Sequence, residues 1–210
     1  TYWSIHKSDN NIITTMTIAL HTSYTQRISL IELAASLFGD NTASSSSREL
    51  EKRFLALIRK EDSLISAICF SYSGSVAEYD DLRQDALINI WRGLPSFRED
   101  STSRTWIYRV VLNSCVSTIR KQMRHSQASE SLDGLYDILA EEPPEDRERI
   151  ETLHRMISTL NPQDKAIILL WLDDASYDDI ATVMGMPRNT VATRLHRIKE
   201  KLKTGGTATM

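Results

Sequence analysis

Residues 176–203, SYDDIATVMGMPRNTVATRLHRIKEKLK, predict two short helices joined by a tight turn. Ser176 can cap the first helix, and Asp179, three residues on, completes a capping box. Gly185 suits the turn, and Pro187 stands where the first turn of a second helix tolerates a missing N–H. The stretch therefore predicts a helix-turn-helix near the end of the chain.

The second of these helices is predicted to have one apolar and one basic face. Apolar residues recur at intervals of four, three and four and define a buried stripe of Val191, Leu195, Ile198 and Leu202. The opposite face carries Arg188, Asn189, Thr193, Arg194, Arg197 and Lys201. Arg, Asn and Thr side chains can hydrogen-bond base edges in a major groove. An ordinary helical hairpin with a solvated basic face is the alternative, but the agreement of cap, turn, stripe and basic face favours DNA.

Charge is unevenly distributed along a chain whose net charge is -3. Residues 104–125 contain five basic residues and no acidic one, and residues 187–203 contain six basic residues against one acidic. Between them, residues 130–151 contain nine acidic residues and two arginines. Two basic modules therefore flank an acidic connector.

The chain is predicted to be all-α, because its 210 residues include only 7 Gly and 5 Pro and no long alternating apolar run. This length suffices for two small helical domains joined by an acidic flexible linker, the C-terminal one being the helix-turn-helix. We expect a polar, flexible N-terminal extension (1–47), a helical domain (48–125), the linker (126–148), the helix-turn-helix domain (149–203) and a tail (204–210).

Several classes of function are excluded because their motifs are absent from the sequence. No stretch is apolar enough to span a membrane and no signal peptide is recognisable, which predicts a cytoplasmic protein. Cys69 and Cys115 lie in apolar, helical contexts and are expected to be free buried thiols rather than a disulfide or metal pair. Phosphate loops, metal-ligand spacings and nucleophile–base pairs are missing, so we expect no enzyme, cofactor or metal site.

Residues 80–92, DDLRQDALINIWR, are predicted to form a helix with a distinct polar side. Leu82, Ala86 and Ile90 fall on one face, which we expect to be buried. The polar side chains that point elsewhere are Gln84, Asp85, Asn89 and Arg92. Such a mixture beside the large aromatic Trp91 is typical of a protein-docking face, and a solvated helix face is the alternative.

Residues 104–124 are predicted to form a basic helix in which Trp106, Tyr108 and Asn113 are interleaved among arginines. That mixture suits single-stranded or partly opened DNA, because cations track phosphates, aromatic rings stack on bases and amides read base edges. Trp106 taken alone also fits a position in the core.

Three blocks of sequence together resemble the extracytoplasmic-function (ECF) sigma factors of the bacterial sigma-70 family. They are DDLRQDALINIWRGLPSFR (80–98), STSRTWIYRVVLNSCVSTIRK (101–121) and LNPQDKAIILLWLDDASYDDIATVMGMPRNTVATRLHRIKEKL (160–202). The resemblance covers roughly residues 48–203. It implies an RNA polymerase sigma factor whose first module melts the minus-ten promoter element and whose second reads the minus-thirty-five element to initiate transcription.

The resemblance also implies three sets of site residues and their partners. The polymerase clamp helices would be bound by Asp81, Gln84, Asp85, Asn89 and Trp91. The minus-ten element would be bound by Ser96, Phe97, Arg98, Ser101, Asn113, Arg120 and Lys121. The loop 96–103 and Asn113 would capture an unstacked base of this element. The minus-thirty-five major groove would receive Arg188, Asn189, Thr190, Thr193, Arg194 and Arg197. Implied partners are core RNA polymerase, through its clamp helices and flap, promoter DNA and, as a candidate, an anti-sigma factor, without membrane insertion.

The sequence leaves three points open. A helix-turn-helix transcriptional regulator with an N-terminal sensor or dimerisation domain would carry a similar hairpin, although it would not need a basic, aromatic helix after a docking helix. The acidic linker either mimics nucleic acid inside a cation-lined polymerase channel or is simply solvated. The extension 1–47 has no counterpart in the minimal family pattern.

Overall fold

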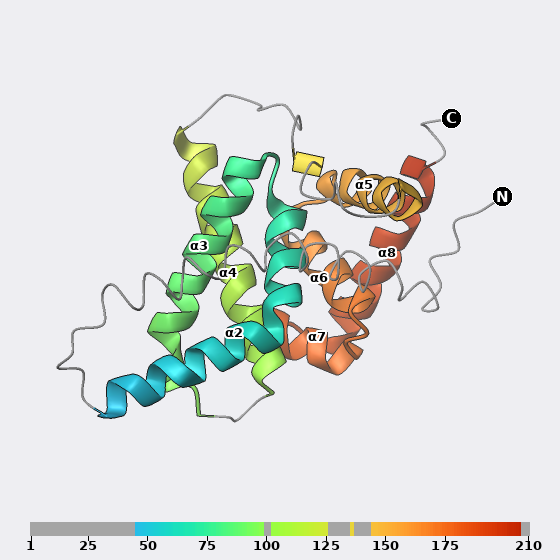
Figure 1. Cartoon of the computed structure of the whole chain (residues 1–210). Coiled ribbons are helices and arrows are strands. Elements are labelled where there is room, and N and C mark those ends of the chain that lie inside the picture. Colours follow the sequence, from blue (N-terminus) through green and yellow to red (C-terminus); the bar gives the residue numbers. More distant parts are fainter. Residues whose placement is uncertain (1–44, 99–101, 126–134, 137–143, 207–210) are drawn as a thin grey trace.

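The computed structural model describes residues 45–98, 102–125, 135–136 and 144–206 (Figure 1). The N-terminal module contains helices α2 (Ser45–Tyr72), α3 (Val76–Gly93) and α4 (Ser103–His125), with the short 3-10 turn η2 (Leu94–Ser96) after α3. The C-terminal module contains α5 (Pro144–Ser158), α6 (Pro162–Leu172), α7 (Tyr177–Met184) and α8 (Arg188–Gly206). All regular structure in the described residues is helical, which confirms the predicted all-α fold.

The helices of the N-terminal module pack around a core that contains a buried ion pair. Arg83, in the middle of α3, is fully buried and pairs with Asp62 of α2, whose side chain is also fully buried. The same guanidinium donates a hydrogen bond of 2.7 Å to Ser66 Oγ. The pair fixes α3 against α2 in one register, because either charge alone would be costly in the apolar interior.

Local capping contacts set the helix bounds of the C-terminal module. Asn161 caps α6 by accepting a hydrogen bond of 3.0 Å from a backbone N–H of its first turn. Ser176 and Asp179 form the predicted capping box of α7, and Gly185 ends that helix in the left-handed conformation, with φ of 63°. The apolar stripe of α8 is buried as predicted, at Val191, Leu195, Ile198 and Leu202.

The two modules pack against each other, with α2 and α4 of the first facing α5, α6 and α7 of the second (Figure 1). Their apolar side chains form one continuous core. The Tyr72 hydroxyl of α2 donates a hydrogen bond to the Pro162 carbonyl of α6, and Lys165 Nζ donates to the Ser71 carbonyl at 3.4 Å. The modules predicted from the sequence are therefore docked in this structure.

Leu135 and Tyr136, which belong to the predicted linker, lie at the junction of the two modules. Leu135 is fully buried, and the Tyr136 ring packs against Phe70 of α2 and His154 of α5. His154 Nε2 lies 3.1 Å from the Phe70 carbonyl, and His154 Nδ1 lies 3.1 Å from the Tyr136 hydroxyl. Burial, together with the positive charge of Lys165, lowers the pKa of His154 to about 4, so its imidazole is neutral at pH 7.

The helix bounds differ in detail from the predicted segments. Helix α2 begins at Ser45, ahead of the predicted boundary at 48, and α5 begins at Pro144, inside the predicted linker. Helix α8 continues to Gly206, into the predicted tail. Most of the predicted extension, residues 1–44, and residues 126–134 and 137–143 of the predicted linker lie outside the described residues.

Candidate nucleic-acid interface

Helix α8 presents most of the predicted base-reading side chains to solvent. Arg188, Asn189, Thr190, Thr193 and Arg197 are all exposed. The Thr193 hydroxyl donates to the Asn189 carbonyl at 2.9 Å, and Arg188 Nε lies 3.3 Å from Asp178 Oδ1 in a solvent-exposed pair. Surface pairs of this kind are weak and exchange readily, so the face is accessible to a ligand.

Arg194 differs from the other predicted base-reading residues, because its guanidinium is held by α6. Arg194 Nε and Nη2 donate to Asp164 Oδ1 at 3.0 and 2.7 Å, and Nη1 donates to Gln163 Oε1 at 2.9 Å. The side chain is only 26% exposed. In this arrangement Arg194 joins α8 to the first turn of α6.

His196 is an exposed residue of α8 that the sequence reasoning left out. It lies three residues after Thr193, a spacing that places the two side chains on the same face of a helix. The helical spacing that identified the buried stripe of α8 could also have placed His196 on this exposed face.

An exposed stripe runs along α3 and combines two polar with two apolar residues, which we name the α3 stripe: Asp81, Gln84, Ile88 and Trp91. Ile88 and Trp91 are 40% and 39% exposed and are the exposed large hydrophobic residues in the described part of the chain. The Trp91 ring meets Phe54 of α2 edge-on, with centroids 5.2 Å apart. The sequence reasoning missed Ile88. It lies four residues after Gln84 and three before Trp91, and these spacings place the three residues on one face of a helix.

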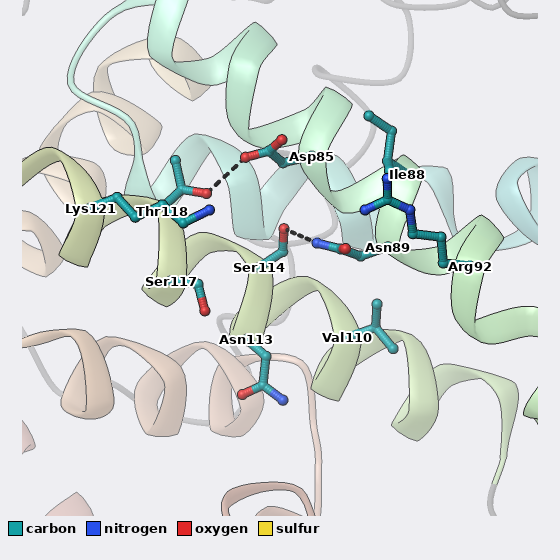
Figure 2. Close-up of a pocket in the computed structure, with 10 residues that line it drawn as sticks. All are labelled: Asp85, Ile88, Asn89, Arg92, Val110, Asn113, Ser114, Ser117, Thr118 and Lys121. Carbon is teal, nitrogen blue, oxygen red and sulfur yellow. Dashed lines mark hydrogen bonds between the residues drawn. The ribbon is translucent and has the colours of Figure 1, made fainter.

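Asp85 and Asn89 contact α4 and line the same pocket as Ile88 of the α3 stripe (Figure 2). The Thr118 hydroxyl donates to Asp85 Oδ2 at 2.8 Å, and Asn89 Nδ2 donates to Ser114 Oγ at 3.0 Å. Both residues, one helical turn apart on α3, therefore join α3 to α4.

The groove between α3 and α4 forms an open pocket of about 510 Å³. Besides Asp85 and Asn89, its lining includes Arg92 of α3 and, from α4, Asn113 and Lys121. Asn113 is exposed and points away from Asp85 (Figure 2). The structure thus brings two predicted minus-ten residues, Asn113 and Lys121, into one groove with two predicted polymerase-binding residues.

An aromatic stack fixes the turn that follows α3. Phe97 stacks on Trp106 of α4 with centroids 4.8 Å apart and planes inclined by 27°. A Cβ placed on Gly93 would come within 3.1 Å of the Trp106 ring, so a larger residue here would push the ring by a few tenths of an ångström. Ser96 and Arg98 are exposed on either side of Phe97, and Arg120 is exposed near the far end of α4. Ser101 lies outside the described residues.

Cys69 and Cys115 are free and fully buried, which confirms the predicted free thiols. They come from α2 and α4, and contact with the Cys69 thiol, together with burial, raises the pKa of Cys115 well above its ordinary value. Within the described residues, no cluster of three or more His, Cys, Asp or Glu side chains could hold a metal ion. None of the helices that could be searched has the length and apolar character needed to cross a membrane.

Comparison with known families assigns each module separately. Residues 57–125 match Sigma-70 region 2, and residues 150–202 match Sigma-70 region 4. The RNA polymerase sigma-H factor of Pseudomonas aeruginosa and the ECF RNA polymerase sigma-E factor of Escherichia coli K12 are each 31% identical to the chain, over 72% of the chain and 85% of their own length. The ECF RNA polymerase sigma factor SigW of Bacillus subtilis is 29% identical over 66% of the chain and 81% of its own length.

Two solved structures share the fold. The sigma factor RpoE of Bartonella quintana, in complex with the anti-sigma factor NepR, matches 78% of this chain and 99% of its own with a TM-score of 0.54 and 20% identity. CnrH, in complex with the cytosolic domain of CnrY, matches 93% of this chain and 99% of its own with a TM-score of 0.57 and 17% identity. With region 2 and region 4 matched in order and ECF relatives at 31% identity, the chain belongs to the extracytoplasmic-function sigma factors of the sigma-70 family, which recognise promoters and initiate transcription.

Proposed function

We propose that this sigma factor binds core RNA polymerase through the α3 stripe. Ile88 and Trp91 expose apolar surface beside the polar residues Asp81 and Gln84, and interfaces combine apolar anchors with a polar rim in this way. This exposed pair is the observation that carries the assignment, because burying apolar surface in a partner is favourable by about 25 cal/mol per Å². Asp85 and Asn89 support the stripe indirectly, by holding α3 against α4.

We assign the minus-thirty-five element to the exposed face of α8. Asn189 and Arg197 offer the amide and guanidinium groups that pair with adenine and guanine edges, and Arg188 and Thr190 lie at the end of the helix that would enter the groove first. Thr193 and His196 extend this face. Arg194, which is tied to α6, positions the helix in this assignment.

The minus-ten element is assigned to the turn after α3 and to the groove between α3 and α4. The stack of Phe97 on Trp106 gives a rigid wall against which an unstacked base can lie, and extruding a base costs a few kcal/mol. Asn113, with one donor and one acceptor group, can read its edge, while Arg92 and Lys121 provide positive charge along the groove for the phosphates.

Core RNA polymerase and promoter DNA are the partners of this assignment, and the protein acts in it by binding, without catalysis of its own. Because polymerase works there, we place the protein in the cytoplasm. The RpoE structure of similar fold is a complex with an anti-sigma factor, which supports an anti-sigma factor as a candidate regulator of this chain. The match of residues 57–125 to Sigma-70 region 2 disfavours the alternative of a regulator with a sensor domain.

Reconstituted transcription with core polymerase and a promoter library tests the proposal. Ile88→Glu is expected to abolish core binding in native-gel titration, because it places a charge in the centre of the interface. Ala56→Glu, at an exposed position of α2, adds the same charge and should bind core as the wild type does. Core binding by Ile88→Glu at wild-type affinity would move the polymerase site away from the α3 stripe.

Promoter melting is tested separately with Asn113→Ala. The variant is expected to bind core polymerase and the minus-thirty-five element normally but to form open complexes less readily on duplex promoters. Permanganate reactivity of promoter thymines measures the opening, and a pre-melted template should restore the activity of the variant. Equal reactivity with wild type on duplex DNA would make Asn113 a structural residue of α4.

A further inference from the structure

We propose that residues 29–38 of the N-terminal extension form an amphipathic helix that docks on the α3 stripe, parallel to α3, and competes there with core RNA polymerase. The docking is independent of the proposed function. The competition rests on the proposed function, because it takes the α3 stripe as the polymerase site.

The sequence of residues 27–40, RISLIELAASLFGD, carries the signals of one short helix, although these residues lie outside the described part of the structure. Ser29 and Glu32 have the spacing of a capping box, and Gly39 is the residue type that commonly ends a helix. Ser36 falls on the same polar face as Ser29 and Glu32. The opposite face is apolar and is formed by Leu30, Ile31, Ala34, Leu37 and Phe38. A short helix of this kind gains most of its stability by packing its apolar face against a partner.

The α3 stripe offers a surface of matching character and length. Ile88 and Trp91 are 40% and 39% exposed and provide apolar area in the middle and at the end of the stripe. The stripe extends over ten residues of helix from Asp81, or about 15 Å, and residues 30–38 would measure about 14 Å as a helix. One helix of this length therefore covers the stripe.

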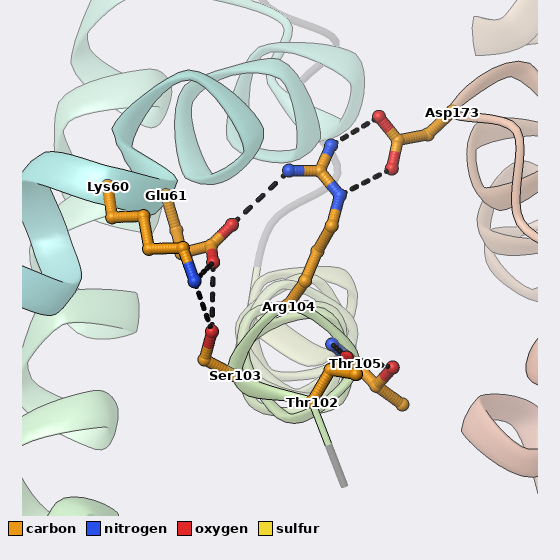
Figure 3. Close-up of polar contacts among 7 residues, drawn as sticks. All are labelled: Lys60, Glu61, Thr102, Ser103, Arg104, Thr105 and Asp173. Carbon is orange, nitrogen blue, oxygen red and sulfur yellow. Dashed lines mark hydrogen bonds and ion pairs between the residues drawn. The ribbon is translucent and has the colours of Figure 1, made fainter.

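The C-terminal module does not compete for this surface. It packs on the N-terminal module through α2 and α4. In that contact, Arg104 of α4 donates hydrogen bonds to Asp173 at 3.0 Å and to Glu61 of α2 at 3.2 Å (Figure 3). Ile88 and Trp91 remain exposed while the two modules are in contact, so the segment 29–38 and the C-terminal module can be bound at the same time.

Charges at the two ends of the segment determine its direction on α3. Arg27 precedes the predicted helix and Asp40 follows it. On α3, the exposed Asp81 begins the stripe and the exposed Arg92 follows its last residue. A segment parallel to α3 pairs opposite charges at both ends, whereas an antiparallel segment would bring like charges together at both ends.

The connection of the segment to α2 favours the same direction. The start of α2 lies beside the end of α3 (Figure 1), where Phe54 meets Trp91 with ring centroids 5.2 Å apart. Ser45 precedes Phe54 by nine residues, or about 14 Å of helix. The six connecting residues 39–44 can extend over about 20 Å, enough to bring Phe38 to Trp91. Because this connection is short, the segment meets the stripe of its own chain more often than that of a second copy.

The first test measures the docking in the full chain without polymerase. Spin labels are placed at Ala77, an exposed residue at the start of α3, and at either Gln26 or Ser36. The native Cys69 and Cys115 are buried and should not compete for the label. Parallel docking predicts a narrow distance distribution for each pair, with the shorter distance for Gln26. A broad distribution, or a shorter distance for Ser36, would overturn the proposal.

Two matched variants test which face of the segment docks. Leu37→Glu places a charge on the apolar face and should broaden the distribution between the labels at Gln26 and Ala77. Ser36→Glu adds the same charge to the polar face and should keep that distribution narrow. A mixture of singly labelled proteins serves as the control for a second copy, and a short distance between molecules in that mixture would overturn docking within one chain.

The second test titrates core polymerase with the unlabelled variants. Leu37→Glu is expected to bind core about three- to tenfold more tightly than wild type, which corresponds to a docked fraction of about 70–90% in the free wild-type protein. Ser36→Glu should bind as wild type does. Equal gains in the two variants would reduce the effect to added charge and overturn the competition.

Two outcomes distinguish the inference from the proposed function. Core binding by Ile88→Glu at wild-type affinity would reject the α3 stripe as the polymerase site. Loss of core binding in Ile88→Glu, combined with a broad wild-type distance distribution or with no gain of core affinity in Leu37→Glu, would reject the docked segment and leave the proposed function intact.

Discussion

The helix caps of the C-terminal module connect residues close in sequence, whereas the buried ion pair of the N-terminal module connects two different helices. Asn161 and the Ser176–Asp179 box each bond a backbone group within three residues. In the N-terminal module, Arg83 reaches Asp62 on another helix. Local caps contribute about 0.5–2 kcal/mol each, while breaking a buried ion pair costs about 3–5 kcal/mol. The two modules should therefore respond very differently to single substitutions.

The largest effect is expected from Asp62→Ala, which leaves Arg83 charged and unpaired in the core. The free energy of unfolding, measured by urea denaturation, should fall by about 3–5 kcal/mol. Glu151→Ala, which breaks a partly exposed pair with Arg147, should cost no more than about 1 kcal/mol. A similar small loss in both variants would mean that the N-terminal module does not depend on its buried pair.

Arg194 makes a long-range contact inside the C-terminal module, to Asp164 of α6. Comparing it with the exposed Arg197 separates a structural role from a base-reading role. Arg197→Ala is expected to lose about 1–3 kcal/mol of discrimination between promoter sequences, with no change in melting temperature. Arg194→Ala should instead lower the melting temperature and weaken all duplexes alike, because its fork is bound to Asp164. Binding to a duplex library together with thermal melts separates the two roles, and sequence-selective losses in Arg194→Ala would return that residue to the base-reading set.

His154 joins the two modules, and its ionisation should make their stability depend on pH. The docked structure lowers its pKa to about 4, against 6.5 for a free imidazole, so the stabilisation is present above pH 6.5 and is lost as the pH falls toward 4. The groups facing it are the Tyr136 hydroxyl, the Phe70 and Ser73 carbonyls and the charge of Lys165.

Between pH 7 and pH 5 this single group should cost about 2 kcal/mol of stability, measured by urea denaturation at each pH. His154→Gln should flatten this part of the pH dependence, whereas His196→Gln, at an exposed position, should leave it unchanged. An unaltered pH profile in His154→Gln would show that other groups govern the effect.

The smallest effect is expected from the cap of α7. Ser176→Ala removes the hydrogen bond to the Asp179 backbone N–H and should lower the free energy of unfolding by about 1 kcal/mol. Ser176→Asp keeps an acceptor at the cap and should restore most of the loss. Thermal denaturation of the three proteins provides the comparison, and a loss as large as that of Asp62→Ala would erase the distinction between the modules.

The helix-turn-helix was predictable because its signals are local. The capping box at Ser176 and the turn at Gly185 are visible within a few residues, and the four-residue stripe of α8 is visible within the twelve residues 191–202; the structure contains all of them. The exposure of Asn189 and Arg197 follows directly from the burial of that stripe, because the two sets occupy opposite sides of one helix.

The remaining features depend on partners that are distant in sequence. Nothing near Arg83 indicates that Asp62 will neutralise it in the core, and Asp164, which binds Arg194, lies 30 residues away. Periodicity placed Asp85 off the apolar face but could not show that Thr118 of α4 would bind it. The docking of the two modules likewise depends on contacts across the whole chain, such as Arg104 with Asp173.

The buried Leu135 and the half-buried Tyr136 also set the length of the tether between the modules. While Tyr136 stays against Phe70, the C-terminal module is connected through residues 137–143, whose extended length is at most about 25 Å. Release of the pair lengthens the tether to residues 126–143, about 60 Å when extended. The effective concentration of one module at the other falls as the tether lengthens. The contacts of Leu135 and Tyr136 therefore influence how readily the two modules dock again after they have separated.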